Sequence, residues 1–395
     1  MTAKADRPFD IIVYGATGYT GRLVAEYLAH HYQGAKANGA PKWAMAGRSA
    51  AKLAEVRDLI GAPADTPLVV ADSDDPASIQ ALAESTRVVV TTVGPYQLYG
   101  EPLLSACVAA GTDYADLCGE PVWMRQMADK YHAAAQASGA RIAFSSGFDS
   151  IPFDLGVLML QKEATARFGA PAPRVKGRVR AMQGKFSGGT AASLTATMAA
   201  LGKDPSLVPI MVSPFGLTPG FEGPAQPRGD APEYDEALGS WCAPFIMAVI
   251  NTKNVHRTNL LLGHPYGADF VYDEMLLTGP GDQGEAIARH VAATPMIGTP
   301  DDPKPGEGPT KEERDTGHYD VLFVGLYPDG RTLHYGVKGR YDPGYGSTSR
   351  MLAETGIALL SCSAGGAIAT PGALLGEALV QRLRDHAEIS FAVEG

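Results

Sequence analysis

An apolar run, a glycine-rich turn and an amphipathic run follow one another in residues 9–28, FDIIVYGATGYTGRLVAEYL. This order predicts a strand, a tight turn and the start of a helix. Glycines at intervals of three bring the backbone of such a turn against a ligand, and the free N–H groups of the first helical turn favour an anion such as a pyrophosphate. The stretch therefore predicts a dinucleotide site. Its predicted contacts are Gly15, Thr17, Gly18, Tyr19, Thr20 and Gly21.

The end of the second predicted strand indicates which dinucleotide binds. An NAD site usually places Asp or Glu there, to bind the ribose 2′-hydroxyl. No acidic residue occurs between Glu26 and Glu55, and the corner instead holds Arg48, Ser49 and Lys52. Cations suit a 2′-phosphate, which a carboxylate would repel. The corner therefore predicts NADP(H), although such charges are also typical of a solvated helix start.

Two more loops are expected at the cofactor, because ligands of open α/β sheets bind at the carboxyl ends of the strands. Asp72 follows the third predicted strand, where it either contacts the adenine or caps a helix. The loop after the fourth strand is predicted to lie near the nicotinamide, and it comprises Val93, Gly94, Pro95 and Tyr96.

The first 150 residues alternate between short apolar runs and helical patterns. Predicted strands cover residues 9–14, 43–46, 68–71, 88–92, 114–117 and 141–144, with helical runs at 50–59, 76–84, 102–110 and 122–137. Near-continuous apolar strands joined by helices are typical of a parallel sheet with helices on both faces. We therefore predict an α/β fold with a doubly wound parallel Rossmann sheet in residues 1–150.

The pattern changes in the middle of the chain. The run RVKGRVRAM, residues 174–182, alternates strictly and places Lys176, Arg178 and Arg180 on one face of a strand. With Lys185, this basic face is either solvated or able to dock an acidic carrier protein. Two further alternating runs flank Pro328-Asp329-Gly330 and predict a hairpin. The middle therefore reads as an α+β domain with an antiparallel sheet, and the polar segment 298–317 as a surface loop.

Composition excludes several classes of function. The net charge is −10 and no long basic block occurs, so nucleic acid is not an expected partner. Four scattered cysteines and nine histidines without HxxxH spacing predict neither a metal site nor a disulfide framework, and reduced thiols suit a cytoplasmic protein. The uncharged segment 355–376 is broken by glycines and a proline, which favours a buried helix and a turn over a transmembrane span.

Several longer motifs carry a family resemblance. In chain order they are GATGYTG, AGRS, VVVTTVGPYQLYG, GTDYADLCGE, SSGFDSIPFDLG, SGGTAAS and DPGYGSTSRMLAE. Together they resemble the saccharopine dehydrogenase-like NADP-binding family and, within it, the mycobacterial trans-acting enoyl reductases. The resemblance implies NADP(H) and a Rossmann domain interrupted by an inserted α+β domain, residues 151–340, for substrate binding or dimerisation. It also implies that residues 341–395 return to the Rossmann domain.

The resemblance further implies an NADPH-dependent reduction of a carbon–carbon double bond on an apolar, lipid- or polyketide-like substrate, free or carrier-bound. Saccharopine reductases instead reduce an imine, and this chain has GFDSIPFD where they carry a DPG-type motif. Two alternatives stay open, a saccharopine-type imine or amino-acid reductase and a non-catalytic NADPH-binding protein associated with lipid. Peripheral membrane contact and a homodimer also stay open.

Enoyl reduction leaves negative charge on an oxygen and needs a proton at carbon. Three residues in motif positions are candidates for the catalytic donor: Tyr96, Asp149 and Tyr345. Each also has an ordinary structural explanation, respectively cofactor packing, a helix cap and a loop aromatic. The turn Ser187–Thr190 precedes a helical run and predicts either an anion-binding turn or an ordinary helix cap.

Overall fold

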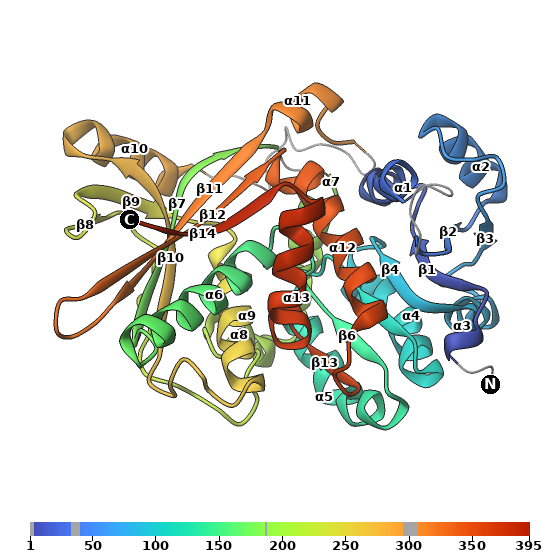
Figure 1. Cartoon of the computed structure of the whole chain (residues 1–395), viewed down its shortest axis with the longest axis horizontal. Helices are drawn as coiled ribbons and strands as arrows, with labels where there is room; N and C mark the ends of the chain where they lie inside the picture. The colour runs from blue at the N-terminus through green and yellow to red at the C-terminus, as the bar shows by residue number, and fades with distance from the viewer. Residues whose placement is uncertain (1–3, 33–39, 186–187, 295–306) are drawn as a thin grey trace.

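The computed structural model describes residues 4–32, 40–185, 188–294 and 307–395. These residues form two seven-stranded sheets, with helices between the sheets and around the first one (Figure 1). The C-terminus lies in the second sheet (Figure 1).

The first sheet is parallel throughout, in the order β13-β6-β5-β4-β1-β2-β3. Ile11 and Val13 of the central strand β1 face one hydrophobic core, while Ile12 and Tyr14 face another. Because both faces are covered, the strands carry continuous apolar runs. The predicted doubly wound parallel sheet is confirmed. Its strands are β1 (Phe9–Tyr14), β2 (Trp43–Gly47), β3 (Leu68–Val70), β4 (Thr86–Thr91), β5 (Asp113–Ala115), β6 (Arg141–Ala143) and β13 (Ala367–Ala369).

Helices from both ends of the chain cover this sheet. They are η1 (Lys4–Asp6), α1 (Tyr19–His31), α2 (Ala50–Leu59), α3 (Pro76–Ser85), α4 (Tyr96–Ala110), α5 (Pro121–Ser138) and α12 (Thr348–Ser361). Glu354 of α12 is fully buried and accepts hydrogen bonds from the hydroxyls of Tyr27 (2.7 Å) and Tyr32 (2.6 Å). Its second carboxylate oxygen lies 2.7 Å from the guanidinium of Arg382. The Glu354 carboxylate therefore joins the C-terminal helices to α1.

The second sheet has the order β14-β12-β11-β7-β10-β9-β8 and is mixed, because β7 pairs with β10 in parallel and its other pairs are antiparallel. The predicted hairpin is present as β11 and β12. The strands are β7 (Arg174–Gln183), β8 (Glu233–Asp235), β9 (Ser240–Pro244), β10 (Val271–Gly279), β11 (His318–Leu326), β12 (Thr332–Arg340) and β14 (Ile389–Glu394). The remaining elements are α6 (Ile151–Phe168), α7 (Gly188–Lys203), η3 (Pro205–Leu207), α8 (Val208–Val212), α9 (Ala248–Leu261), α10 (Gly281–Ala293), α11 (Lys311–Thr316), η4 (Pro343–Ser347) and α13 (Pro371–His386).

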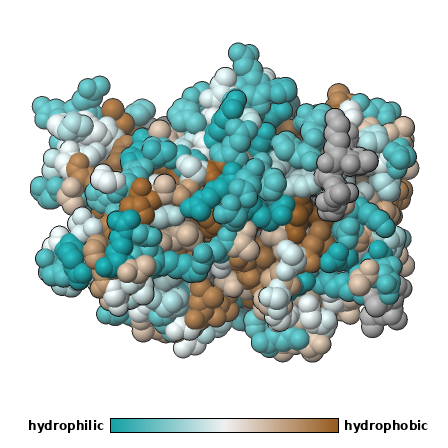
Figure 2. Space-filling view, in the orientation of Figure 1, coloured by the Kyte–Doolittle hydropathy of each residue, from teal (hydrophilic) through white to brown (hydrophobic). Residues whose placement is uncertain are grey.

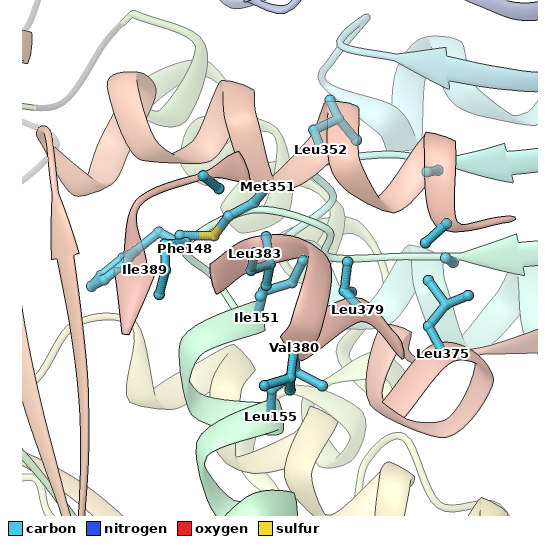
Figure 3. Packing of buried hydrophobic residues seen from close by; sticks show 14 of the residues in the cluster. Phe148, Ile151, Leu155, Met351, Leu352, Leu375, Leu379, Val380, Leu383 and Ile389 are labelled. Carbon is cyan, nitrogen blue, oxygen red and sulfur yellow. The ribbon is translucent and has the colours of Figure 1, made fainter. Parts of the chain in front are cut away.

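Apolar side chains from α6 and α13 form the core between the two sheets. Figure 3 shows Ile151 and Leu155 of α6 beside Leu379, Val380 and Leu383 of α13, all of them buried. The two helices contact each other, and α6 also contacts β11 and β12. The second sheet is therefore packed against the Rossmann half through this helix pair.

The C-terminal segment is divided between the two sheets. β13 pairs with β6 of the first sheet, and β14 pairs with β12 of the second. From the sequence, we expected all of residues 341–395 to pack on the Rossmann domain. The pairing of β14 with the second sheet differs from this expectation. Ile389 and Phe391 are buried while Ser390 and Ala392 are exposed, an alternation that suits an edge strand with one covered face. A boundary near residue 341 stays a proposal.

The basic residues of β7 do not form a free surface. Arg178 is fully buried, and its guanidinium contacts the carboxylates of Asp235 (3.2 Å) and Asp273 (2.8 Å). Lys176 also pairs with Asp235, and Arg180 pairs with carboxylates of β11 and β14. A buried guanidinium needs such partners because its desolvation costs several kcal/mol, roughly. The expected basic face is therefore occupied by ion pairs within the fold at Lys176, Arg178 and Arg180, and only Lys185, which pairs with Glu313, is well exposed among these four residues.

The exposed surface mixes polar and apolar residues. Figure 2 shows the hydrophobic residues of one face in separate patches among hydrophilic ones. Among the helices of the described residues, none is long and apolar enough to cross a bilayer.

Candidate cofactor and active site

The glycine turn between β1 and α1 is built on close backbone contacts. Gly15 has φ +89°, a conformation that side chains disfavour, and a Cβ there would lie 2.7 Å from Val93 Cγ2. A Cβ on Gly21 would lie 2.1 Å from the carbonyl oxygen of Gly15. Gly18 is the N-cap of α1, and its N–H donates to the Gly15 carbonyl (2.9 Å). The glycines therefore let α1 begin directly against the turn.

The N-terminus of α1 is suited to an anion. Its N-cap, Gly18, supplies no side-chain hydrogen bond to the helix, and the first turn holds no acidic residue. The start of α4 is different, because the Glu120 carboxylate accepts the N–H groups of Tyr96 (2.9 Å) and Gln97 (2.8 Å). That helix end already has an anion from the chain itself, so α1 is the helix that offers a phosphate site beside the first sheet's central strand.

The corner after β2 presents cations to solvent. Arg48 and Lys52 are exposed. Ser49 is the N-cap of α2, and its hydroxyl accepts the N–H of Lys52 (3.3 Å). The corner thus holds a capping serine between two accessible cations, and their contact with a 2′-phosphate stays a prediction.

Asp72 and the helix cap after β3 are different residues. The Asp72 carboxylate accepts the N–H of Asp74 (3.2 Å) within the turn. The N-cap of α3 is Asp75, whose carboxylate accepts the N–H of Ala77 (3.1 Å). The capping alternative for Asp72 is therefore wrong, and its contact with the adenine stays a prediction.

A cleft of about 930 Å³ opens where the glycine turn, the loop between β4 and α4, and α7 meet. Gly18, Tyr19 and Thr20 line one side, and Gly94 and Pro95 line the next. Helix α7 supplies a wall of small residues, Ala192, Ala196, Ala199 and Ala200. Val93 instead packs its side chain on Gly15. The cleft thus adjoins the predicted phosphate site.

Two hydrogen bonds attach α7 to the Rossmann domain. The Gln97 amide donates to the Thr197 hydroxyl (3.0 Å), and the Ser193 hydroxyl donates to Glu120 (2.9 Å). Glu120 and Ser193 were not singled out from the sequence, although both lie in the motifs GTDYADLCGE and SGGTAAS. Glu120 could have been found from its position, because it is an acidic residue just before the helix predicted at residues 122–137. Ser187 of the second motif lies outside the described residues.

Tyr96 is buried, and its hydroxyl is used within the fold. It donates to the Thr91 carbonyl (3.3 Å) and accepts the N–H of Leu117 (3.1 Å). Burial raises the pKa of Tyr96 well above its usual value. These contacts hold the loops after β4 and β5 together.

Asp149 follows β6 at the carboxyl edge of the first sheet and is half-buried. Burial raises the pKa of its carboxyl group from 3.8 to about 7. A Cβ on Gly119 would lie 3.0 Å from the Asp149 carboxylate, so the loop after β5 covers this group closely. Burial therefore favours the protonated form of the Asp149 carboxyl group.

Tyr345 lies in η4, where the C-terminal segment meets the glycine turn. Its ring packs edge-on against the ring of Tyr19, with centroids 5.2 Å apart. Its hydroxyl lies 3.4 Å from the hydroxyl of Thr190 in the first turn of α7. Because Tyr19 lines the cleft, the structure brings Tyr345 next to the cofactor turn, as expected for a tail that packs back.

The comparisons with known proteins agree with this geometry. Residues 11–142 match the model of the saccharopine dehydrogenase NADP-binding domain. A Mycobacterium tuberculosis protein with the provisional name of a trans-acting enoyl reductase is 39% identical over 97% of each chain. A trans-acting enoyl reductase of Mycobacterium ulcerans is 34% identical, over 96% of this chain and 97% of its own.

The chain belongs to the saccharopine dehydrogenase-like family of NADP-binding oxidoreductases, together with these trans-acting enoyl reductases.

A solved structure shares the fold of the family. Apo saccharopine dehydrogenase (L-Glu forming) of Saccharomyces cerevisiae is 10% identical, aligns over 98% of this chain and 100% of its own, and has a TM-score of 0.54. The matched NADP-binding domain contains the glycine turn, the open N-terminus of α1 and the Arg48 corner, all of which fit a phosphorylated dinucleotide. The protein is thus an oxidoreductase of an NADP-dependent family, with NADP(H) as its cofactor.

Proposed function

We propose that this protein is an NADPH-dependent enoyl reductase, which reduces a carbon–carbon double bond conjugated to a carbonyl group on an apolar, lipid- or polyketide-like substrate. The names of its relatives support the reaction. The lining of the 930 Å³ cleft is the single observation that supports the substrate class, because it is built largely of glycine, alanine, proline and threonine.

The charges of the cleft argue against an amino-acid substrate. Within the described lining, the charged residues are Lys203 and Glu307. Lys203 ends α7, about 21 Å from Gly189 by the helical rise of 1.5 Å per residue. Glu307 precedes Gly308, which packs against Tyr19 at the other end. The described lining thus offers a zwitterion one cation and one anion, which belong to separate elements, whereas an apolar chain lies against its alanines without loss.

Separate parts of the chain would bind the cofactor and exclude water from the reacting atoms. NADPH, when bound, supplies the hydride. The N-terminus of α1 would hold the pyrophosphate, and Arg48 and Lys52 would hold the 2′-phosphate. The small apolar face of α7 excludes water, which strengthens hydrogen bonds to the carbonyl oxygen as negative charge develops there.

Tyr345 is the proton donor that we propose. Its hydroxyl lies 3.4 Å from the hydroxyl of Thr190, which follows Gly189 of the cleft wall. Asp149, with its pKa of about 7, is the second candidate, since it can donate a proton near neutral pH.

The test measures NADPH oxidation with three groups of compounds: enoyl thioesters, free and carrier-bound; long-chain enones; and the imine precursors of saccharopine. Turnover of the enoyl compounds alone supports the proposal, and turnover confined to the saccharopine precursors contradicts it. Tight NADPH binding without any turnover, together with flotation on liposomes, would instead support the non-catalytic alternative. Tyr345→Phe should lower kcat by at least about 100-fold if Tyr345 is the donor. If Asp149→Asn has that effect instead, the donor is Asp149.

A further inference from the structure

Tyr19 separates two cavities at the start of α1. On one side it lines the 930 Å³ cleft, and on the other it lines a cavity of about 490 Å³ against residues 307–311 and Arg314. The second cavity is formed by α1, the end of α2 and the segment that leads into α11, and α11 connects to the second sheet at the top of Figure 1. The Tyr19 side chain is therefore a wall between the cofactor turn and the inserted domain.

The inserted domain contacts Tyr19 through a fixed helix start. Helix α11 begins with a capping box, in which Thr310 and Glu313 exchange hydrogen bonds. The Arg314 guanidinium donates to the Tyr19 hydroxyl (3.0 Å) and to the Pro309 carbonyl (2.9 Å). The Tyr19 hydroxyl itself donates to the Pro309 carbonyl. A Cβ on Gly308 would lie 2.7 Å from the Tyr19 ring, so the segment fits closely over it.

The same contacts extend to Tyr345 and return to Arg314. The Tyr19 ring packs on the Tyr345 ring at 5.2 Å. The N–H of Tyr345 donates to the buried Asp342 carboxylate (3.0 Å), and the N–H of Asp342 donates to the Arg314 carbonyl (2.9 Å). These four residues form a closed circuit that joins α1, α11 and η4.

We infer that Tyr19 and Arg314 are positioning residues, which hold the Tyr345 side chain in register with the first turn of α1. The inserted domain thereby controls where the proposed donor lies relative to the cofactor turn. This inference rests on the proposed function of Tyr345. A displacement of about 1 Å at a reacting group lowers the rate by up to about 100-fold, so loss of the circuit should act mainly on kcat.

The experiment compares Arg314→Met, Tyr19→Phe, Arg314→Lys and the control Lys311→Met in the full chain. Lys311 is on the same helix and lines the same outer cavity, but its ammonium pairs with Asp315. We expect Arg314→Met and Tyr19→Phe to lower kcat by about 10- to 100-fold, and Arg314→Met to change the Kd of NADPH less than about threefold. Arg314→Lys keeps a donor for the hydroxyl and should recover part of the loss. The double variant Arg314→Met/Tyr19→Phe should lower kcat no more than the more severe of its two single variants, because the two residues act as one unit.

A second readout requires neither substrate nor cofactor. Amide hydrogen exchange of the apo protein should accelerate at residues 344–347 in Arg314→Met, with a Tm within about 2 °C of wild type, and should be unchanged in Lys311→Met. Unchanged kcat and unchanged exchange in Arg314→Met would overturn the inference, as would equal effects in Lys311→Met. If wild type reduces no enoyl compound, the proposed function fails, and the exchange result alone then decides whether the circuit holds η4.

Discussion

Replacement of Glu354 by Gln should weaken the attachment of the C-terminal helices to the Rossmann domain. The carboxylate is fully buried, and its Oε2 accepts from Arg382 Nε (2.8 Å) and lies 2.7 Å from Nη2. The hydroxyls of Tyr27 in α1 and of Tyr32, the C-cap of α1, donate to Oε1. A glutamine retains one acceptor for the tyrosines but turns an amide N–H₂ towards the guanidinium. Each charged hydrogen bond is worth about 1.5–3 kcal/mol.

Arg382 recovers part of this loss, because its side chain is 27% exposed and can reach water. We therefore expect the free energy of unfolding to fall by about 3 kcal/mol, at the lower end of the range for breaking a buried pair. The matched control is Glu377→Gln in α13, whose partner Lys162 and own side chain are 50% and 60% exposed, so its loss should be below about 1 kcal/mol. Urea denaturation of the full chain, followed by circular dichroism, compares the two. If Glu354→Gln costs no more than Glu377→Gln, the role of this buried cluster is refuted.

Three further changes test the cofactor site and the acid. Gly21→Ala places a Cβ 2.1 Å from a backbone carbonyl and should weaken NADPH binding at least about tenfold in a fluorescence titration, whereas Gly202→Ala, with open space around it, should not. Arg48→Ala should weaken NADPH binding by about 1.5–3 kcal/mol and leave NADH nearly unchanged; equal losses for both cofactors would contradict the 2′-phosphate contact. Because burial raises the pKa of Asp149 to about 7, the folded state retains a proton that the unfolded state releases near 3.8, so stability falls as pH rises between these values. Asp149→Asn should remove that part of the decrease in Tm between pH 5 and pH 8, and a parallel decrease in both proteins would contradict the assigned pKa.

Local patterns predicted the Rossmann half well, because its signals lie within single segments. The apolar run of β1, the glycine spacing and the amphipathic run of α1 are contiguous, and each is fixed by its own backbone geometry. The acid-free corner at Arg48 is likewise a local feature. Such segments fold as their periodicity indicates, since the parallel sheet requires apolar residues on both faces of each strand.

Features that depend on distant partners could not be predicted. The alternating sequence of β7 predicted which side chains share a face of the strand. The carboxylates that neutralise Arg178, however, lie 57 and 95 residues further along the chain. Without these partners, a solvated face was the reasonable expectation. Likewise, Arg314 lies 295 residues from Tyr19, in a polar segment that reads as a surface loop. Its position over the cofactor turn follows from the packing of the inserted domain and not from any local pattern.

Transfer of deuterium from NADPH deuterated at the transferred position tests the central claim most directly. The substrate is an enoyl thioester that the wild-type protein turns over, and mass spectrometry locates the label in the saturated product. Our account predicts one deuterium from the cofactor at the β-carbon and, in a separate reaction in D₂O, one from solvent at the α-carbon, since the two hydrogens come from the hydride and from the proton donor. A product without label from the cofactor, or with that label at the carbonyl carbon, would contradict the account.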